Sequence, residues 1–300
     1  MTLISKDLKC LLNDVWLCGL RGFSRLEKES SVVQEMLEES EAALGTEWPL
    51  EERRRTLQRA RQLLEERFAS FVDAIAEEAR KPRTLSEGEV GRALINIDAA
   101  LGFLNEPTDR VIPLDATGDL NGVWRAFPRG VVVGITPYNF PLNLVLHKVL
   151  PALCLGAPII IKPDPRTPRA ALLLAELFAD AGLPKGFFLA RACSIEEIHE
   201  LCADERVEVI SFTGSESVGW MLKERYPAKQ VLLELGGSAT AIYTRSTVLD
   251  SDAHSLARAA LVYSGQVCIS TQNVLVERRQ LPDFVSQMRS SMAAMKRGDV

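Results

Sequence analysis

Residues 130–141 read GVVVGITPYNFP, a short apolar run of mainly β-branched residues followed by a segment rich in turn residues. Four similar runs come later in the chain, and segments with helical periodicity separate them. They are residues 158–161, 207–212, 231–235 and 240–243. Strands that alternate with helices form a parallel sheet covered on both faces. We therefore expect an α/β fold built on such a sheet.

One of the intervening helices has clear end signals. Thr167 and Pro168 precede residues 170–181, and Gly182 follows them. This order predicts a helix with a threonine N-cap, a proline in its first turn and a glycine just after its end.

The first third of the chain has mostly helical periodicity. We predict helices over residues 30–44 and 87–104, and one long amphipathic helix that begins at Pro49 and ends at Lys81-Pro82. Residues 111–128 are expected to form two antiparallel strands joined around residues 119–122, because Asn-Gly favours hairpins. Residues 1–23 are predicted to form a short hairpin or helix, and a signal peptide is the less favoured alternative.

Two reactive residues stand in apolar surroundings after the strands. Cys268 lies in YSGQVCIS, residues 263–270, and Glu234 lies in LELGG, residues 233–237. A thiolate can add to an aldehyde carbon, and a carboxylate can activate the water that later releases the acid. Because leucines flank Glu234, we expect a partly buried carboxylate. A single cysteine among apolar residues is more often a small buried hydrophobe, and that alternative stays open on residue types alone.

Four motifs together resemble the aldehyde dehydrogenase superfamily. They are TPYNFP at 136–141, SFTGS at 211–215, LELGG at 233–237 and GQVC at 265–268. The resemblance runs from about residue 30 to the end of the chain. It implies an oxidoreductase with an aldehyde-dehydrogenase-like fold, in which residues 1–233 hold the N-terminal helices and a Rossmann-type dinucleotide-binding domain. Residues 108–129 would form an oligomerisation hairpin, and residues 234–300 the first, incomplete part of a second α/β catalytic domain.

The resemblance also implies roles for individual residues. Cys268 matches the nucleophile, Glu234 the base, and Asn139 the amide that stabilises the oxyanion together with the backbone N–H of Cys268. Lys162 matches the lysine that binds the adenosine ribose. Residues 214–219 follow a strand and open a helix, where backbone N–H groups can meet a pyrophosphate. The residues expected to bind the cofactor are Ile135, Thr136, Pro137, Tyr138, Lys162, Gly214, Ser215, Val218, Gly219, Leu235 and Gly236.

The chain departs from the family pattern in the region that selects the cofactor. Pro165 stands where many NAD-preferring members carry a glutamate, and Arg166 follows it. Without that carboxylate, Arg166 or Arg169 could attract a 2′-phosphate, so we expect NAD or NADP, with NADP tolerated or preferred. Residues 189–193, LARAC, replace a glycine-containing loop, which puts cofactor affinity in question.

The motifs also point to a branch of the family and to a class of substrate. They look most like the branch that oxidises lactaldehyde, phosphonoacetaldehyde or glyceraldehyde 3-phosphate. Asn273 replaces an arginine that could serve anionic substrates or the fold. We therefore expect a small aldehyde as substrate.

Composition narrows the partners and the location. A net charge of −5 argues against nucleic acid or an anionic membrane as the main partner. The six cysteines include no CxxC pair, which favours a reducing, cytoplasmic location, and the three histidines lie too far apart in sequence to suggest a metal site. By resemblance, the full-length form is expected to be a homodimer or homotetramer.

Two alternative functions stay open at this stage. Residues 298–300 read as sequence from the middle of a domain, so we expect a truncated product. Such a chain could be a catalytically inactive, dehydrogenase-like module that binds a dinucleotide or a partner. An acylating enzyme that passes its thioester to coenzyme A is less favoured, because Glu234 supplies a hydrolytic base.

Overall fold

The computed structural model describes residues 31–106, 109–244, 248–296 and 298, so the expectation for residues 1–23 lies outside the described part. The α-helices are α2 (Val32–Leu44), α3 (Leu50–Glu66), α4 (Phe68–Ala79), α5 (Arg83–Phe103), α6 (Asn143–Leu155), α7 (Arg169–Asp180), α8 (Ile195–Ala203), α9 (Glu216–Arg225), α10 (Asp250–Leu261) and α11 (Leu281–Ala293). The strands are β1 (Asp109–Pro113), β2 (Asn121–Arg125), β3 (Val131–Ile135), β4 (Ile159–Lys162), β5 (Phe188–Ala190), β6 (Val207–Thr213), β7 (Gln230–Glu234), β8 (Ala239–Tyr243) and β9 (Thr271–Val276). Two short 3₁₀ turns are η1 (Val262–Gly265) and η2 (Arg278–Gln280).

The centre of the molecule is a five-stranded sheet in the order β5-β4-β3-β6-β7, with every neighbouring pair parallel. This confirms the predicted α/β fold with a parallel sheet. Two details of the prediction are wrong. The run at 240–243 is β8, which pairs with β9 in a separate sheet, and residues 188–190 form strand β5, which the prediction omitted.

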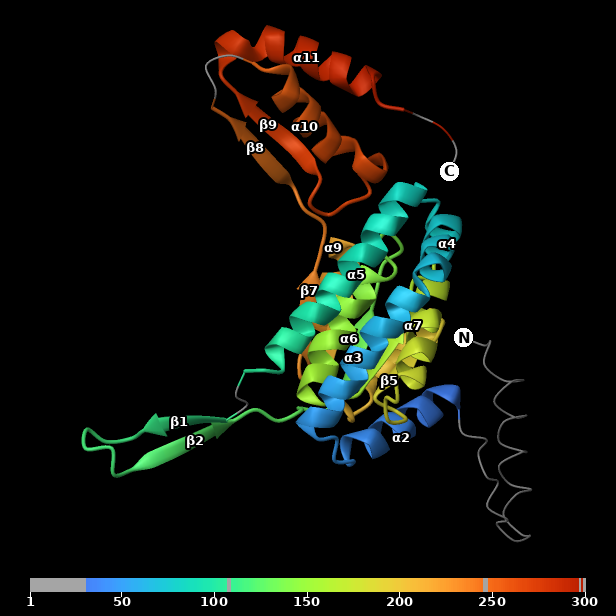
Figure 1. The fold of residues 1–300 in the computed structure, drawn as a ribbon, viewed down its shortest axis with the longest axis vertical. Coiled ribbons are helices and arrows are strands. Elements are labelled where there is room, and N and C mark those ends of the chain that lie inside the picture. The colour runs from blue at the N-terminus through green and yellow to red at the C-terminus, as the bar shows by residue number, and fades with distance from the viewer. Residues whose placement is uncertain (1–30, 107–108, 245–247, 297, 299–300) are drawn as a thin grey trace, which may run out of the picture.

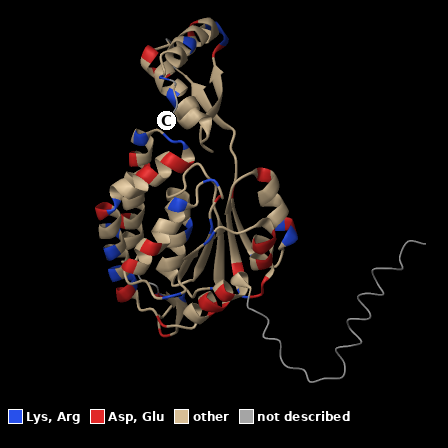
Figure 2. Ribbon diagram, turned by 90° about the vertical axis from the view of Figure 1, so that its right-hand side faces the viewer, with Lys and Arg blue, Asp and Glu red and all other residues tan. Residues whose placement is uncertain are grey.

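Helices cover both faces of this sheet (Figure 2). Helices α3 to α7 pack against Ile159 and Ile161 on one face, whereas α2, α8 and α9 pack against Ile160 on the other. Successive side chains of a strand point to opposite faces, so a continuous isoleucine run can serve two cores at once. All three isoleucines are fully buried.

The helical periodicity from Pro49 to Lys81 belongs to two helices and not to one. Helix α3 stops at Arg67, whose backbone leaves the helical region with φ −101° and ψ 16°, and α4 begins at the next residue. Both helices place their apolar residues in the same core, so the sequence pattern continues across the break. Helix α4 then ends at Arg80, in the left-handed region with φ 49°.

The cap predicted for α7 is also different from the one observed. Pro168 is the N-cap, and the buried Oγ1 of Thr167 has no hydrogen-bond partner among the described residues. At the other end Gly182 adopts φ +84°, as expected for a glycine just after a helix.

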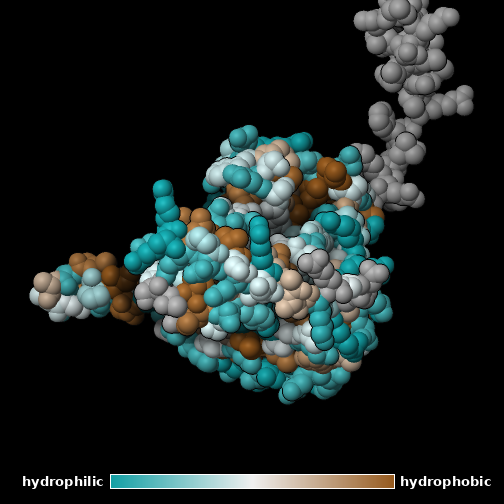
Figure 3. Space-filling view, turned by 90° about the horizontal axis from the view of Figure 1, so that it is seen from above, coloured by the Kyte–Doolittle hydropathy of each residue, from teal (hydrophilic) through white to brown (hydrophobic). Residues whose placement is uncertain are grey.

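Strands β1 and β2 form the predicted antiparallel hairpin, which extends away from the body of the molecule (Figure 1). Its turn is residues 114–120, where Oδ1 of Asp115 accepts a hydrogen bond of 2.7 Å from the Gly118 amide. Asn121 and Gly122 therefore lie within β2 and not in the turn, because an aspartate closes the loop instead. The hairpin exposes 65% of Val123 and carries apolar surface along its length (Figure 3).

Residues 239–293 form a second, smaller unit beyond the carboxyl end of the main sheet (Figure 1). Its two parallel strands, β8 and β9, are joined through α10, and α11 packs beside α10. On the sheet the neighbours Ile242 and Leu275 are 70% and 58% exposed. Within the described ranges, no helix combines the length and apolar character that crossing a bilayer requires.

Candidate active site

A cavity of about 660 Å³ lies where strands β3, β4, β6 and β7 end, and the loop 265–268 forms part of its wall. This is the edge at which open parallel sheets bind their ligands, and the volume is typical of a small-molecule site. The cavity brings together most of the residues that the sequence singled out. They are Ile135, Thr136, Pro137, Tyr138, Asn139, Lys162, Gly214, Ser215, Val218, Glu234, Leu235, Gly236 and Cys268.

Gly219 is the one predicted site residue that does not line the cavity. It is a buried residue of α9 that faces β7, and a Cβ atom there would come within 2.5 Å of Leu235 Cδ2. Its position in this structure therefore serves the close packing of α9 against β7.

Cys268 follows an unusual turn. Tyr263, Ser264 and Gly265 all have positive φ values, of 53°, 55° and 74°. Such a conformation is costly for residues other than glycine and persists only where the surroundings hold it. Here Tyr263 is buried, and its hydroxyl donates a 2.6 Å hydrogen bond to the carbonyl of Ala79.

Among the described cysteines, Cys268 alone is exposed. Burial raises the pKa of the Cys154 thiol to about 11 and the pKa of the Cys202 thiol to about 12, so both stay protonated near neutral pH. The environment that makes a cysteine an inert hydrophobe therefore applies to those two and not to Cys268.

The glycine pair after β7 allows the segment that follows Glu234 to approach the cysteine loop. A Cβ atom on Gly237 would come within 2.6 Å of the Cys268 carbonyl oxygen. Only a residue without a side chain tolerates this approach, so Gly237 keeps the segment that follows Glu234 against the backbone of Cys268.

Asn139 and Tyr138 connect the loop after β3 to the cysteine loop. The Asn139 Nδ2 donates a 2.8 Å hydrogen bond to the carbonyl of Gln266, and the Tyr138 hydroxyl donates one of 2.7 Å to Gln266 Oε1. The amide of Asn139 has two N–H groups, so one remains available to a ligand. Both contacts hold the residue that lies two positions before Cys268.

Glu234 is exposed, which contradicts the expectation of a partly buried carboxylate. The physical reason lies in the sheet order, because β7 is an edge strand and Glu234 is its last residue. The apolar neighbours along the strand alternate toward the α2–α8–α9 core, whereas Glu234 points the other way.

Lys148 of α6 is a charged residue near the site that the sequence did not identify as functional. Its Nζ donates hydrogen bonds of 3.0 Å to Ser211 Oγ and 2.8 Å to Thr213 Oγ1. Burial lowers its pKa to about 8, and the negative charge of Glu234 opposes this shift. A lysine in a largely apolar helix was the available signal.

The cofactor-selecting segment does contain a carboxylate, in the form of Asp164. It lines the cavity and binds Arg166 through two side-chain hydrogen bonds of 2.8 Å. The Arg166 guanidinium also lies over the Tyr138 ring, 3.8 Å from its centre. Arg169 does not line the cavity and pairs with Glu77 at 2.6 Å, so Arg166 is the arginine placed to meet a ligand.

The apolar end of the cavity lies between helices α8 and α9. Ile195 and Ile198 come from α8, and Val218 and Met221 come from α9, with His199 beside them. An apolar slot with few polar groups suits a flat ring system. Except for Val218, these residues carry no motif, so sequence reasoning missed them.

A buried polar atom at the other end fits a polar ligand. Thr136 lines the cavity, and its buried Oγ1 has no hydrogen-bond partner among the described residues. The cavity therefore offers an apolar slot, an unsatisfied hydroxyl, the Lys162 ammonium and the N-terminus of α9, a set of groups that fits a dinucleotide.

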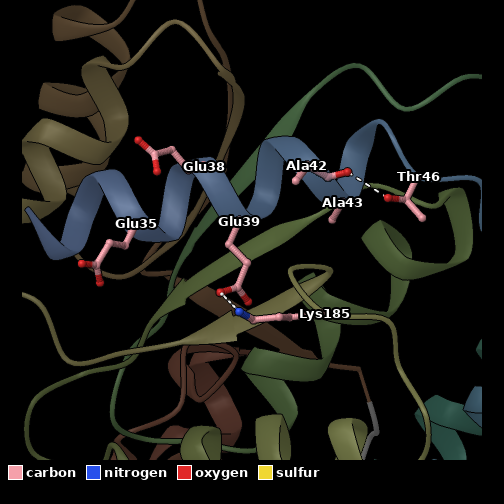
Figure 4. A pocket seen from close by; sticks show the side chains of 7 residues that line it. All are labelled: Glu35, Glu38, Glu39, Ala42, Ala43, Thr46 and Lys185. Carbon is pink, nitrogen blue, oxygen red and sulfur yellow. Dashed lines mark hydrogen bonds and ion pairs between the residues drawn. The ribbon is translucent and has the colours of Figure 1, made fainter. Parts of the chain in front are cut away.

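A second hollow, of about 540 Å³, lies along α2 and holds none of the predicted site residues. Glu35, Glu38 and Glu39 line it, and only Glu39 pairs with Lys185, at 3.2 Å (Figure 4). This acidic surface would repel the phosphates of a dinucleotide. In the described part of the chain, no group of three His, Cys, Asp or Glu side chains is arranged to hold a metal ion.

Comparisons with known proteins give the family. The model of the aldehyde dehydrogenase family matches residues 25–300. A similar relative is 3-sulfolactaldehyde dehydrogenase from Priestia aryabhattai, which is 35% identical over 244 residues that cover 79% of this chain and 51% of the relative. The chain spans about half the length of the curated relatives it matches.

Solved structures with a similar fold include two dehydrogenases that act on aldehydes by name. Aldehyde dehydrogenase 21 from Physcomitrella patens, in complex with the reaction product succinate, is 31% identical, with a TM-score of 0.84 over 89% of this chain and 57% of that one. The glyceraldehyde-3-phosphate dehydrogenase of Methanocaldococcus jannaschii, complexed with NADP, is 28% identical, with a TM-score of 0.83 over 89% and 59%. Since the family model matches nearly the whole sequence, this chain belongs to the aldehyde dehydrogenase family.

Proposed function

We propose that this chain carries the cofactor groove and the catalytic residues of an NAD(P)-dependent aldehyde dehydrogenase that oxidises an aldehyde to a carboxylic acid. The observation that carries the proposal is the shared cavity. Cys268, Glu234 and Asn139 line the same space as Lys162 and Thr136, although 129 positions separate Asn139 from Cys268 in the sequence.

The chemistry divides among three side chains. The Cys268 thiolate adds to the aldehyde carbon, and the carbonyl oxygen becomes an alkoxide that the free N–H of Asn139 can stabilise. A bound nicotinamide supplies the acceptor for the hydride, which leaves with two electrons as the alkoxide collapses to a thioester. Glu234 then takes a proton from water, the water oxygen adds to the thioester carbon, and the acid leaves as the Cys268 thiol forms again.

Both NAD and NADP are proposed as cofactors. Arg166 uses its Nε and one Nη group on Asp164, which leaves further N–H donors for a 2′-phosphate. The NADP complex of the Methanocaldococcus jannaschii relative supports this proposal. Calorimetry of dinucleotide binding tests this proposal. Arg166→Ala should weaken the binding of NADP by roughly tenfold more than the binding of NAD. Equal losses for both cofactors would exclude Arg166 from a 2′-phosphate contact.

The proposed substrates are small hydroxyaldehydes. Support comes from the named activities of two relatives, the 3-sulfolactaldehyde dehydrogenase described above and a lactaldehyde dehydrogenase of Methanocaldococcus jannaschii that is 30% identical. A panel of lactaldehyde, its sulfonated analogue and an aromatic aldehyde tests this choice, and preference for the aromatic aldehyde would overturn it.

We also propose self-association through the β1–β2 hairpin. Val111, Val123 and Trp124 of the hairpin and Phe127 just after it are 52 to 72% exposed, and apolar side chains gathered on one projecting element are typical of an interaction surface. Val123→Asp should then reduce the dimer fraction seen in sedimentation velocity. An unchanged fraction would remove the hairpin from the interface.

The function itself is tested by NAD(P)H formation with Cys268→Ser beside the parent chain. Cys193→Ser is the matched control, because Cys193 does not line the cavity. Turnover should vanish only in the first variant. Dinucleotide binding without turnover in the parent chain would favour the inactive binding module, and turnover that requires coenzyme A would favour the acylating enzyme.

A further inference from the structure

We propose that the buried ion pair between Lys81 and Glu89 is a positioning device that holds the Asn139 loop and the Cys268 loop in one arrangement. The inference rests on the proposed function, since it assigns these loops to catalysis. Neither residue lines the cavity. Lys81 lies in the connection between α4 and α5, and Glu89 lies in α5.

Lys81 contacts both loops at once. Its Nζ lies 2.6 Å from Glu89 Oε2, with the two side chains 1% and 0% exposed. The same Nζ donates a 2.8 Å hydrogen bond to the backbone carbonyl of Asn139. It also lies 3.7 Å from the ring centre of Phe140 and 4.7 Å from that of Tyr263, so its charge faces two aromatic rings.

Glu89 fixes the far end of the Asn139 loop. Its Oε1 accepts hydrogen bonds from the backbone amides of Leu142, at 3.0 Å, and Asn143, at 3.1 Å. These amides stand at the start of α6, where a helix lacks internal partners and favours a negative charge. One buried pair therefore binds the loop that carries Asn139 on both sides.

Tyr263 links the same pair to the cysteine loop. It begins the run of three residues with positive φ, and its ring packs edge to face with Phe140 at 6.3 Å. Burial raises the pKa of Tyr263 to about 12, so its hydroxyl stays protonated and keeps donating to Ala79. The conformation that leads to Cys268 is thus held by contacts to α4 and to Lys81.

Stability alone is a poor account of this pair. Burying two charges costs about as much as their attraction returns, and apolar replacements of similar volume are often neutral or stabilising. What an apolar pair could not supply is the set of directed hydrogen bonds to Asn139, Leu142 and Asn143. These bonds connect Lys81, which follows α4, and Glu89 of α5 to the Asn139 loop, and the Lys81 charge also faces the Tyr263 ring of the cysteine loop.

Hydrogen exchange of the double variant Lys81→Met/Glu89→Gln tests the proposal. The glutamine keeps an oxygen for Leu142 and Asn143, and no lone charge is left buried. Exchange at the amides of Gln266 and Ser270, which hydrogen-bond within the loop, should rise by about tenfold or more, as expected when one anchoring hydrogen bond is lost. The five-stranded sheet should keep its protection, and kcat should fall while dinucleotide affinity stays within about twofold.

Arg83→Met is the matched control, because Arg83 lies two residues away in an exposed ion pair with Asp73. It should leave the loop unchanged. If the double variant fails to fold, Tyr263→Phe carries the same prediction for the loop, through loss of the bond to Ala79. Unchanged loop exchange in a folded variant, or equal loss of protection across the sheet, would overturn the proposal. Absence of turnover in the parent chain would instead count against the proposed function, because the exchange result does not depend on catalysis.

Discussion

The two units of the chain differ in how completely they bury their sheets. In the five-stranded sheet Ile160 and Ile161 face opposite cores and are both fully buried, whereas Ile242 and Leu275 of the two-stranded sheet are 70% and 58% exposed. Cys268 belongs to the second unit, in the loop between η1 and β9, and lines the cavity at the end of the five-stranded sheet. The proposed cofactor groove is therefore built by a closed region, and the proposed nucleophile is carried at the border of an open one.

The largest effect on stability is expected in the closed unit. Phe178 is fully buried and packs edge to face with Phe188 at 5.8 Å. Phe178→Ala should lower the free energy of unfolding by about 3 to 5 kcal/mol through lost burial and a cavity. Urea unfolding measures this loss of free energy. Phe103→Ala is the control, because Phe103 is 54% exposed. Similar losses in the two variants would mean that this core is not the stable part.

The next effect concerns catalysis at the border between the units. Asn139→Ala removes the amide that can meet the alkoxide and also its bond to Gln266. Loss of one such donor raises the barrier by about 2.7 to 4 kcal/mol, so turnover should fall by roughly a hundredfold or more. Steady-state kinetics at saturating cofactor give the answer. Unchanged turnover would remove Asn139 from the mechanism.

A pH dependence is expected from Lys148, beneath the closed sheet. Burial lowers its pKa to about 8 from the usual 10.5, so between these values the unfolded chain binds more protons than the folded one. Stability from this group therefore rises with pH across that window, by up to about 3 kcal/mol. The free energy of unfolding, measured at pH 7.5 and pH 10, should rise with pH in the parent chain and not in Lys148→Met. An equal change in both proteins would contradict the lowered pKa of Lys148.

The smallest effect is expected on the open face. Ile242→Ala removes a side chain that is mostly in solvent, so the free energy of unfolding should change by less than about 0.5 kcal/mol. Thermal or urea unfolding checks this against Ala253→Gly in the buried side of the same unit. A large loss at Ile242 would mean that the face is covered in solution, and the contrast between the units would then be weaker.

Local sequence predicted the main sheet because each strand is a short apolar run and each crossover is a helix. Local sequence failed where two different structures are compatible with the same residue pattern. The periodicity from Pro49 to Lys81 does not reveal a break at Arg67, since both helices face one core. Strand β5 is too short for a pattern of its own, and only its pairing with β4 defines it.

The candidate site was predictable in its motifs and unpredictable in their surroundings. TPYNFP and GQVC led to Asn139 and Cys268, which the structure places in one cavity. The exposure of Glu234 depends on β7 being an edge strand, which follows from the sheet order and not from neighbouring leucines. Lys148, Asp164 and the pair Lys81–Glu89 act through contacts across 50 or more positions or through side-chain geometry, neither of which a pattern contains.

In the proposed mechanism Cys268 carries the acyl group and Glu234 directs its hydrolysis. The most direct measurement is the mass of the peptide that contains Cys268 after the Glu234→Gln variant has met aldehyde and oxidised cofactor together. We expect an acyl adduct on Cys268 that forms only with both reactants and that the parent chain hydrolyses. Aldehyde oxidation without any adduct at Cys268, or an adduct that forms without cofactor, would contradict it.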